Sequence, residues 1–297
     1  MRVAITGASG MIGRALVRSL EADGHTVHRL VRDRGRAVAG DIWWQPSQGD
    51  LDAKALEGVG AVVHLAGHPI GRFLWTGSER TKLWDSRVNS GRLLANAIAS
   101  LDAKPSVYVS QSGSNAYGPR GDEVLTESST RGTGFLAELC AAWEQSAGPA
   151  VQAGVRVVHP RTGLVLDGHE GVLRKLRLPF LVFAGGRYGD GRQWMPWISL
   201  TDEVRAIRHL IDSDLAGPVN LCAPEPARNA DFMAALGAAL HRPARVPTPA
   251  WFFAGVLGEF GRTLALDSVR AVPQALLDSG FEFRDTDVAA TLASLLA

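Results

Sequence analysis

Three features of the sequence predict an α/β fold, in which a doubly wound parallel sheet carries a smaller, mostly helical lobe toward the C-terminus. Short apolar runs alternate with longer amphipathic stretches over residues 1–165, which is typical of βαβ units. A glycine-rich turn stands between the first apolar run and the first amphipathic stretch. Beyond residue 163 the alternation ends, and Gly-rich and Pro-rich stretches separate further helices.

The elements of the expected core follow in order along the chain. Strands are predicted where short apolar runs occur, at 2–6, 26–32, 61–65, 106–111 and 155–159. Helices are predicted between them at 11–23, 78–99 and 133–153, with a shorter connection near 52–58. In the last of these helices, Phe135, Leu139 and Trp143 recur every four residues and share one face.

The remainder of the chain is expected to form the substrate side. Its helices are predicted near 202–212, 229–241 and 285–295. We therefore divide the chain into a nucleotide-binding core over 1–165 and a substrate-side region over 166–297. Parts of 200–225 are expected to return to the core.

Composition and charge exclude several classes of protein. The 297 residues are 46% hydrophobic and 21% charged, which excludes disordered, collagen-like and coiled-coil chains. A net charge of +1 gives no electrostatic footprint for a nucleic-acid partner. The two cysteines and the spacing of the histidines predict neither a disulfide framework nor a metal site. No apolar run reaches the roughly 20 residues that a membrane-spanning helix requires, and the first run is too short for a signal peptide. We therefore expect a cytoplasmic protein without a membrane partner.

The glycine-rich turn predicts a dinucleotide site of the Rossmann type. Its residues are Gly7, Ser9, Gly10, Met11, Ile12 and Gly13. Glycines permit the tight turn and let the backbone approach a pyrophosphate, while the following helix presents free N–H groups to the anion. The alternative is an ordinary turn between a strand and a helix.

The tip of the second strand indicates which dinucleotide binds. A carboxylate there bonds the ribose 2′-OH, whereas an Arg suits a 2′-phosphate. This chain has Arg32 at the tip, with Arg34 and Arg36 nearby, and Asp33 is interpreted as a turn residue. Because a guanidinium binds phosphate through two hydrogen bonds, Arg32 favours NADP(H) over NAD(H). The alternative is a solvated, charged loop.

Several phrases along the chain resemble a known family. His64-Leu65-Ala66-Gly67 follows the third strand, and Ser110-Gln111-Ser112 with Tyr117-Gly118 follows the fourth. With the glycine-rich turn, they resemble an extended short-chain dehydrogenase/reductase of the epimerase/dehydratase type. Other phrases resemble a branch described only as epimerase family protein or cell-division-inhibitor-like, whose C-terminal domain of unknown function corresponds to about 245–297. These phrases are Lys82–Val88, Phe135–Glu138, Trp143-Glu144, Pro160–Gly163, Gly185-Gly186, Trp194–Ile198 and Gly280–Phe283.

The resemblance implies cofactor contacts and a reaction type. Its further NADP(H) contacts are Leu65, Ala66, Gly67, Arg87, Pro160 and Arg161. It also implies hydride chemistry, in which a Ser hydrogen-bonds the substrate oxygen, a Tyr moves a proton, and a Lys four residues later lowers the pKa of that Tyr. Ser112 matches the Ser position, but the Tyr and Lys positions hold Phe135 and Leu139. With three tyrosines and four lysines, the chain contains no Tyr-x-x-x-Lys.

Two interpretations of this departure remain open. In the first, Tyr117 is the acid beside Ser112, and the oxidised cofactor, Arg87 or Arg161 supplies the positive charge. In the second, Tyr117 packs in the interior and the site binds NADP(H) without turnover.

The loop over 185–197 is expected to contact the substrate. Trp194 and Trp197 can wall a pocket for a flat or apolar ligand, Tyr188 belongs to the same loop, and Arg192 can pair with an acid. The alternative is that the tryptophans fill the core.

These features predict one function and leave two alternatives. The prediction is an NADP(H)-binding oxidoreductase acting on a small carbonyl or hydroxyl substrate, with Ser112 polarising the oxygen and Tyr117 as proton donor. The alternatives are a catalytically silent NADP(H)-binding sensor and a nucleotide-sugar epimerase. The helices at 78–99 and 133–153 either form the seam of a homodimer or face the sheet.

Overall fold

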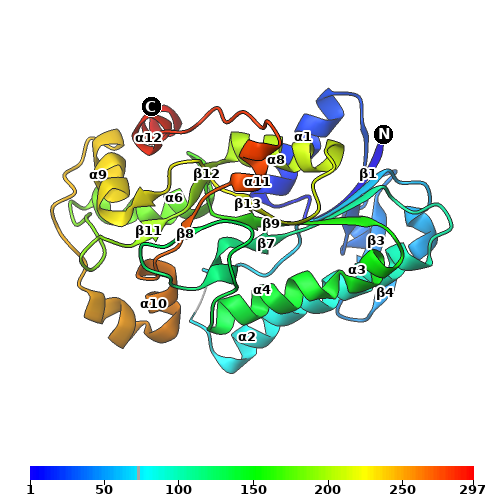
Figure 1. The fold of residues 1–297 in the computed structure, drawn as a ribbon, viewed down its shortest axis with the longest axis horizontal. Coiled ribbons are helices and arrows are strands. Elements are labelled where there is room, and N and C mark those ends of the chain that lie inside the picture. The colour runs from blue at the N-terminus through cyan, green and yellow to red at the C-terminus, as the bar shows by residue number, and fades with distance from the viewer. Residues whose placement is uncertain (72–73) are drawn as a thin grey trace.

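A nine-stranded sheet forms the centre of the molecule (Figure 1), and the computed structural model describes residues 1–71 and 74–297. In spatial order its strands are β13 (Gly217–Leu221), β9 (Arg156–Thr162), β6 (Val107–Ser110), β5 (Ala61–His64), β1 (Arg2–Thr6), β2 (Thr26–Val31), β3 (Ile42–Gln45) and β4 (Asp50–Leu51). The short strand β7 (Ser112–Gly113) pairs with β9. All pairings from β13 to β3 are parallel, and β4 alone runs antiparallel, against β3.

The strand order reverses between β1 and β5. The chain runs from β1 through β2 to β3, and then crosses to β5, β6, β9 and β13 on the other side of β1. In open parallel sheets, ligands bind outside the carboxyl ends of the strands at such a reversal. The topology therefore indicates a ligand site at the residues that follow Thr6 and His64.

Helices cover both faces of the sheet (Figure 1). One face carries α1 (Met11–Ala22) and α8 (Leu200–Asp212). The other carries α3 (Ser90–Ser100), α4 (Phe135–Ser146) and α5 (Gly148–Gln152), and α3 is preceded by α2 (Gly77–Trp84) and the π-helical turn η3 (Asp85–Asn89). Short 3₁₀ turns are η1 (Arg34–Arg36), η2 (Ala53–Leu56) and η4 (Ser114–Tyr117).

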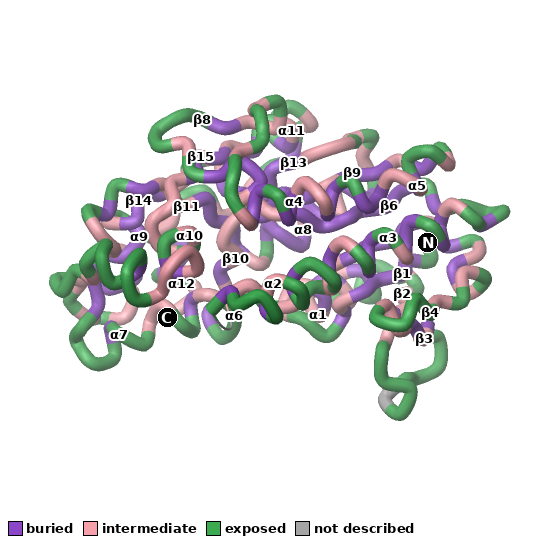
Figure 2. The backbone as a smooth tube through the Cα atoms, turned by 90° about the horizontal axis from the view of Figure 1, so that it is seen from below, coloured by how far each residue is buried: buried purple, intermediate pink, exposed green. Residues whose placement is uncertain are grey.

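The alternation of side chains along the strands explains the two layers. Val3 and Ile5 of β1 pack with Leu16 of α1 and Leu210 of α8, whereas Ala4 belongs to the core on the opposite face. The central strands are buried over almost their whole length (Figure 2), as expected for parallel strands covered by helices on both sides.

The lobe is built from short elements around its own core, which includes Trp197, Phe180 and Phe232. Its helices are α6 (Gly171–Leu176), α7 (Leu178–Leu181), α9 (Asn229–Ala239), the π-helical η5 (Phe252–Val256), α10 (Gly258–Ala265), α11 (Gln274–Asp278) and α12 (Val288–Leu296). Three two-stranded sheets pair β10 (Leu164–Leu166) with β12 (Trp197–Ser199), β11 (Trp194–Met195) with β14 (Ala227–Arg228), and β15 (Arg270–Ala271) with β8 (Val124–Leu125).

The predicted fold class is confirmed, and the differences concern individual elements. The helix expected at 78–99 is interrupted by η3, and the one expected at 133–153 breaks between Ser146 and Gly148. Strands β3 and β13 were not among the predicted elements. Both α8 and β13 lie in the core, whereas the boundary at residue 165 stays a prediction. Within the described residues, no helix is long and apolar enough to span a membrane.

Candidate active site

The glycine-rich turn closes tightly onto the loop after β5. Gly7 has a φ of +70°, and a Cβ on it would lie 2.7 Å from the carbonyl carbon of Leu65. A Cβ on Gly13 would lie 2.8 Å from the Cα of Ala8. Gly10 precedes α1, and no side chain of the described residues caps the helix N-terminus. The first amides of a 12-residue helix thus remain available to an anion at the reversal of the sheet.

A buried histidine holds this loop in place. His64 Nδ1 lies 2.7 Å from Thr6 Oγ1, which also accepts hydrogen bonds from the backbone N–H groups of Leu65 and Ala66. On its other side, His64 Nε2 lies 3.1 Å from Ser90 Oγ. Burial, reinforced by the charge of Arg87, lowers the pKa of His64 to about 4, so that the ring is neutral at pH 7.

Arg87 contributes a buried positive charge beside the same loop. Its guanidinium stacks close to Gly67 and lies 5.1 Å from the Trp143 ring centre. Among the described residues, only its Nη1 has hydrogen-bond partners, the carbonyl oxygen of Leu83 and Ser86, while Nε is buried without one. Burial lowers its pKa to about 10, and no carboxylate pairs with it in the described part of the chain. A buried donor of this kind suits an anionic or hydroxyl-rich ligand.

Ser112 lies in a buried ionic network at the carboxyl end of the sheet. Its hydroxyl donates to Glu144 Oε1 at 2.8 Å. Glu144 also accepts two hydrogen bonds from Arg161, at 2.9 and 3.0 Å, and one from Arg131. Burial of Glu144 opposes ionisation, but the two arginines outweigh it and hold the pKa of Glu144 at about 2. The positive charge of Arg161 is therefore already neutralised by Glu144.

A second acid lies on the opposite side of this sheet edge. Gln111 donates to Thr162 at 2.6 Å, and Thr162 donates to Glu203 Oε1 at 2.9 Å. Glu203 Oε2 is buried without a partner in the described chain. Burial raises the pKa of Glu203 to about 8, so this carboxyl group is protonated at neutral pH.

Tyr117 is placed in the interior of the molecule. Its ring is fully buried with Leu125 and Cys222, and its hydroxyl donates to Asn220 Oδ1 at 2.7 Å. Burial raises the pKa of Tyr117, which makes it a poorer acid. Its role as proton donor stays a prediction, and the geometry favours the alternative in which Tyr117 packs in the interior.

The expected substrate residues separate into surface and core positions. Trp197 is fully buried in the lobe and donates its indole N–H to the carbonyl oxygen of Glu225, which supports the core-filling alternative. Trp194 lies between Arg228 and Arg270, whose guanidinium carbons are 4.0 and 4.6 Å from its ring centre.

The remaining two loop residues have different surroundings, and only Arg192 borders a surface hollow. Tyr188 stacks on Phe253, with ring centres 4.7 Å apart. Arg192 lines a hollow of about 490 Å³ next to Asp122. Substrate contact at Tyr188, Arg192 and Trp194 stays a prediction.

The arginines after β2 differ in their surroundings. Arg32 is exposed beyond the end of β2, whereas the Arg34 guanidinium stacks 3.8 Å from the Trp43 ring centre. Asp33 accepts a hydrogen bond from the Gly35 N–H, as a turn residue does. The side chain of Arg36 lies outside what the structure describes.

An apolar cluster fills the positions at which the resembled family carries Tyr and Lys. Leu139 is buried among Trp75, Leu83 and Leu136, and Phe135 packs against this cluster. Trp75 links two aromatic rings, because its ring centre lies 5.4 Å from that of Phe135 and 5.6 Å from that of Phe260 in α10. Helix α10 of the lobe is therefore docked over the start of α4.

Four charged or titratable residues near this site were not predicted from the sequence. Glu144 appeared in a matching phrase without a role, and Glu203 follows a predicted helix start with no signal of burial. His68 and its partner Glu79 are separated by eleven positions and meet only through the fold. The described residues contain no group of three or more His, Cys, Asp or Glu side chains arranged to hold a metal ion.

Comparisons with known proteins cover the whole chain. A model of the NAD dependent epimerase/dehydratase family matches residues 3–139, and the domain of unknown function DUF1731 matches 248–295. An epimerase family protein of Mycobacterium bovis is 43% identical over 98% of this chain and 96% of its own. The crystal structure of human epimerase family protein SDR39U1 with NADPH has a TM-score of 0.91 at 30% identity, covering 100% of this chain and 99% of that one. A Corynebacterium glutamicum structure described as a nucleoside-diphosphate sugar epimerase has a TM-score of 0.82 at 36% identity, covering 100% and 58%. The chain belongs to the NAD dependent epimerase/dehydratase family, in the branch of epimerase family proteins that carry a DUF1731 domain.

Proposed function

We propose that this protein is an NADP(H)-dependent oxidoreductase that acts on a small carbonyl or hydroxyl compound. The observation that carries the proposal is the glycine-rich turn, whose glycines leave no room for side chains and whose helix N-terminus has no side-chain cap. These features fit a pyrophosphate at the reversal of the sheet. When bound, the cofactor supplies a hydride equivalent to the substrate carbon or accepts one from it.

Each part of the cofactor has residues that suit it. The first amides of α1, at Met11, Ile12 and Gly13, would bind the pyrophosphate, and Arg32 would bind the 2′-phosphate. The loop Leu65–Gly67 and the strand end at Pro160 and Arg161 would line the rest of the cofactor. Arg87, with its unpartnered Nε, would donate to the ribose or phosphate oxygens nearest Gly67.

Ser112 would bind the substrate oxygen. Its proton now points to Glu144, and turning that proton toward a substrate carbonyl leaves Glu144 with its two arginine partners. The rotation therefore leaves no buried charge unpaired. The geometry supports Ser112 as the polarising group more directly than it supports Tyr117 as the acid.

Cofactor choice is tested by titrating NADPH and NADH calorimetrically into the protein and into Arg32→Ala. Loss of a charge-assisted phosphate contact should weaken NADPH by about 10- to 100-fold and leave NADH unchanged. Arg34→Ala is the matched control, because Arg34 is engaged with Trp43, and it should have the smaller effect. Equal weakening of both cofactors by Arg32→Ala would refute the 2′-phosphate role.

Turnover is tested by NADPH consumption with a panel of aldehydes, ketones and quinones. Ser112→Ala should reduce turnover by about 100-fold, as expected for loss of a group that stabilises developing charge, and Tyr117→Phe should retain it. The filling of the Tyr and Lys positions by Phe135 and Leu139 favours a second candidate, a silent NADP(H)-binding sensor. Tight NADPH binding without consumption of any compound would support that sensor.

A further inference from the structure

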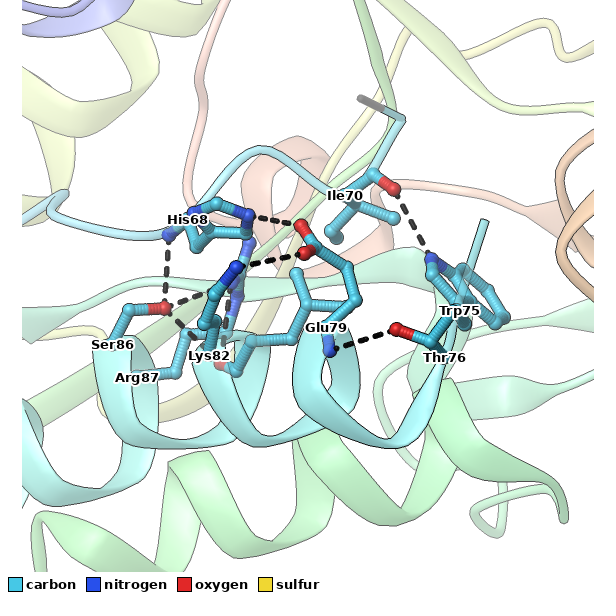
Figure 3. A network of polar contacts seen from close by, with 9 residues as sticks. His68, Ile70, Trp75, Thr76, Glu79, Lys82, Ser86 and Arg87 are labelled. Atoms are coloured by element: carbon cyan, nitrogen blue, oxygen red, sulfur yellow. Dashed lines mark hydrogen bonds and ion pairs between the residues drawn. The ribbon is translucent and has the colours of Figure 1, made fainter. Parts of the chain in front are cut away.

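His68 and Glu79 form a partly buried acid–base pair in the loop after β5 (Figure 3). His68 directly follows Gly67, in the loop that leaves the carboxyl end of β5 at the reversal of the sheet. Its Nε2 is in close contact with Glu79 Oε1. The Glu79 side chain is 8% exposed, whereas the His68 ring is 22% exposed and still reaches solvent.

Several contacts fix this pair in one orientation. The backbone N–H of His68 donates to Ser86 Oγ at 2.9 Å, which anchors the loop to η3. Glu79 lies in the first turn of α2, where the Thr76 side chain caps the helix by accepting from the Glu79 N–H. Lys82 Nζ lies 3.4 Å from the second carboxylate oxygen. The hydrogen bond from His68 lowers the pKa of Glu79 and, with Lys82, outweighs its burial, so Glu79 is ionised beside the ring.

An ionised carboxylate on Nε2 prepares the other ring nitrogen for proton transfer. It fixes the ring orientation and stabilises the imidazolium form, as oriented histidines in hydrolases require. Nδ1 of His68 makes no hydrogen bond to any residue within 1–71 or 74–297. It is therefore available to a ligand bound beside this loop.

We propose that His68, oriented by Glu79, is the catalytic acid and base of this site, and this assignment rests on the proposed NADP(H)-dependent function. In carbonyl reduction, the carbon gains a hydride with two electrons from NADPH. The carbonyl oxygen gains the proton from the His68 imidazolium, which becomes neutral imidazole. In the reverse direction, neutral His68 takes the hydroxyl proton. Glu79 is a positioning residue in both directions.

Other charged groups approach His68 from the elements packed against it. Glu79 and Lys82 come from α2, and Arg87 comes from η3 (Figure 3). Lys175 of α6 donates to the carbonyl oxygen of Gly71, further along the same loop. Across the sheet edge, Glu203 titrates near pH 8, and His64 titrates near pH 4, outside the physiological range.

The test uses the charge that distinguishes the two cofactor forms. The nicotinamide ring is positive in NADP⁺ and neutral in NADPH, while the 2′-phosphate is common to both. If protonated His68 faces that ring, it repels NADP⁺ alone. The ratio of the NADP⁺ to the NADPH dissociation constant should then fall by about tenfold when His68 loses its proton.

Calorimetric titrations between pH 5.5 and 9 would compare four variants with the unchanged protein. His68→Gln keeps an N–H for Glu79 and should abolish the change below pH 7.5 while retaining NADPH affinity. Glu203→Gln should affect only the range near pH 8, and His241→Asn, an exposed site at the end of α9, should change nothing. Glu79→Gln should shift the midpoint of the change to lower pH.

The outcomes separate the two proposals. If NADPH does not bind at any pH, the proposed function fails. If both cofactors bind but their ratio is independent of pH, or if His68→Gln leaves the change intact, the assignment of His68 is overturned.

Discussion

Arg87 and Arg161 are both buried arginines near the carboxyl ends of the strands, but only Arg161 has a carboxylate partner in the described part of the chain. Two hydrogen bonds join Arg161 to Glu144, whereas the Nε of Arg87 has no partner within residues 1–71 and 74–297. A buried charge without a partner lowers the stability of the folded protein, which indicates that Arg87 is there to bind a ligand. The two residues should therefore respond in opposite ways to the same substitution.

We predict that Arg87→Met stabilises the ligand-free protein by about 1 to 3 kcal/mol, since a desolvated charge is replaced by an apolar chain. The same variant should bind NADPH at least about tenfold more weakly. Arg161→Met is the control and should cost about 3 to 5 kcal/mol, because it removes the buried partner of Glu144. Urea unfolding and NADPH titration check both. Destabilisation by Arg87→Met with unchanged NADPH affinity would contradict a ligand-binding role.

Glu203 makes stability depend on pH. The folded protein keeps its proton up to about pH 8, whereas the unfolded chain loses it near the ordinary value of 4.5. Its stabilising contribution is therefore complete below pH 4.5 and is lost as pH rises to 8. The Glu203→Gln variant has no titratable group at this position. Its free energy of unfolding, compared with that of the unchanged protein, should therefore increase by about 3 to 5 kcal/mol as pH rises from 4.5 to 8.5. Urea unfolding at the two pH values measures this, and an equal difference at both would show that Glu203 is ionised in the fold.

Residue-level prediction succeeded where one short segment makes the contact and failed where distant segments meet. The glycines of the turn and the Asp33 turn are local, and the sequence identifies them. Tyr117 is only five positions from Ser112 in sequence, but η4 carries its ring into the interior toward Asn220. The pairing of His68 with Glu79 depends on how α2 returns beneath the loop, which no spacing reveals.

The helices and strands that the sequence predicts are those with a clear apolar pattern. The strand predicted at 2–6 is β1, because an apolar run ends at a glycine turn. Strand β13 was missed because Gly217 and Pro218 are typical of a turn, and its pairing with β9 at the sheet edge outweighs that preference. Helix α10 was not predicted either, since its packing is supplied by Trp75 from a distant segment.

Apolar contacts should contribute more than the surface ion pair to the docking of α10. Phe260→Ala removes an aromatic contact and should destabilise the protein by about 2 to 3 kcal/mol. Glu259→Gln removes an ion pair with Arg80 whose two side chains are 39% and 36% exposed, and it should cost less than about 1 kcal/mol. Hydrogen exchange of residues 252–265 and urea unfolding provide the measurements. A larger effect of Glu259→Gln would show that charge, and not apolar contact, docks the helix.

At the scale of the whole molecule, the C-terminal segment is part of the core. Leu276 and Phe281 pack in the same cluster as Val3 and Leu210. The backbone N–H groups of Arg284 and Asp285 donate to the buried carboxylate of Asp202 at the start of α8. The core and the lobe therefore follow one another along the chain, but the C-terminal segment of the lobe packs into the core.

Truncation tests this integration. A chain ending at residue 247 should lose more than about 5 kcal/mol of stability, because it removes several core side chains and leaves Asp202 without its backbone partners. The full chain should unfold in one transition by both far-UV circular dichroism and tryptophan fluorescence. A truncated protein with a Tm within a few degrees of the full chain would contradict the shared core.

The aromatic contacts of Trp75 limit which side chains positions 135 and 139 can carry. Phe135 and Leu139 occupy the Tyr and Lys positions of the resembled family, and they also form the surface on which α10 is seated. Replacing Leu139 by Lys would bury an ammonium group at a site that is 1% exposed, before any substrate gained from it. A Tyr and Lys pair at positions 135 and 139 would therefore require α10 to leave this surface first.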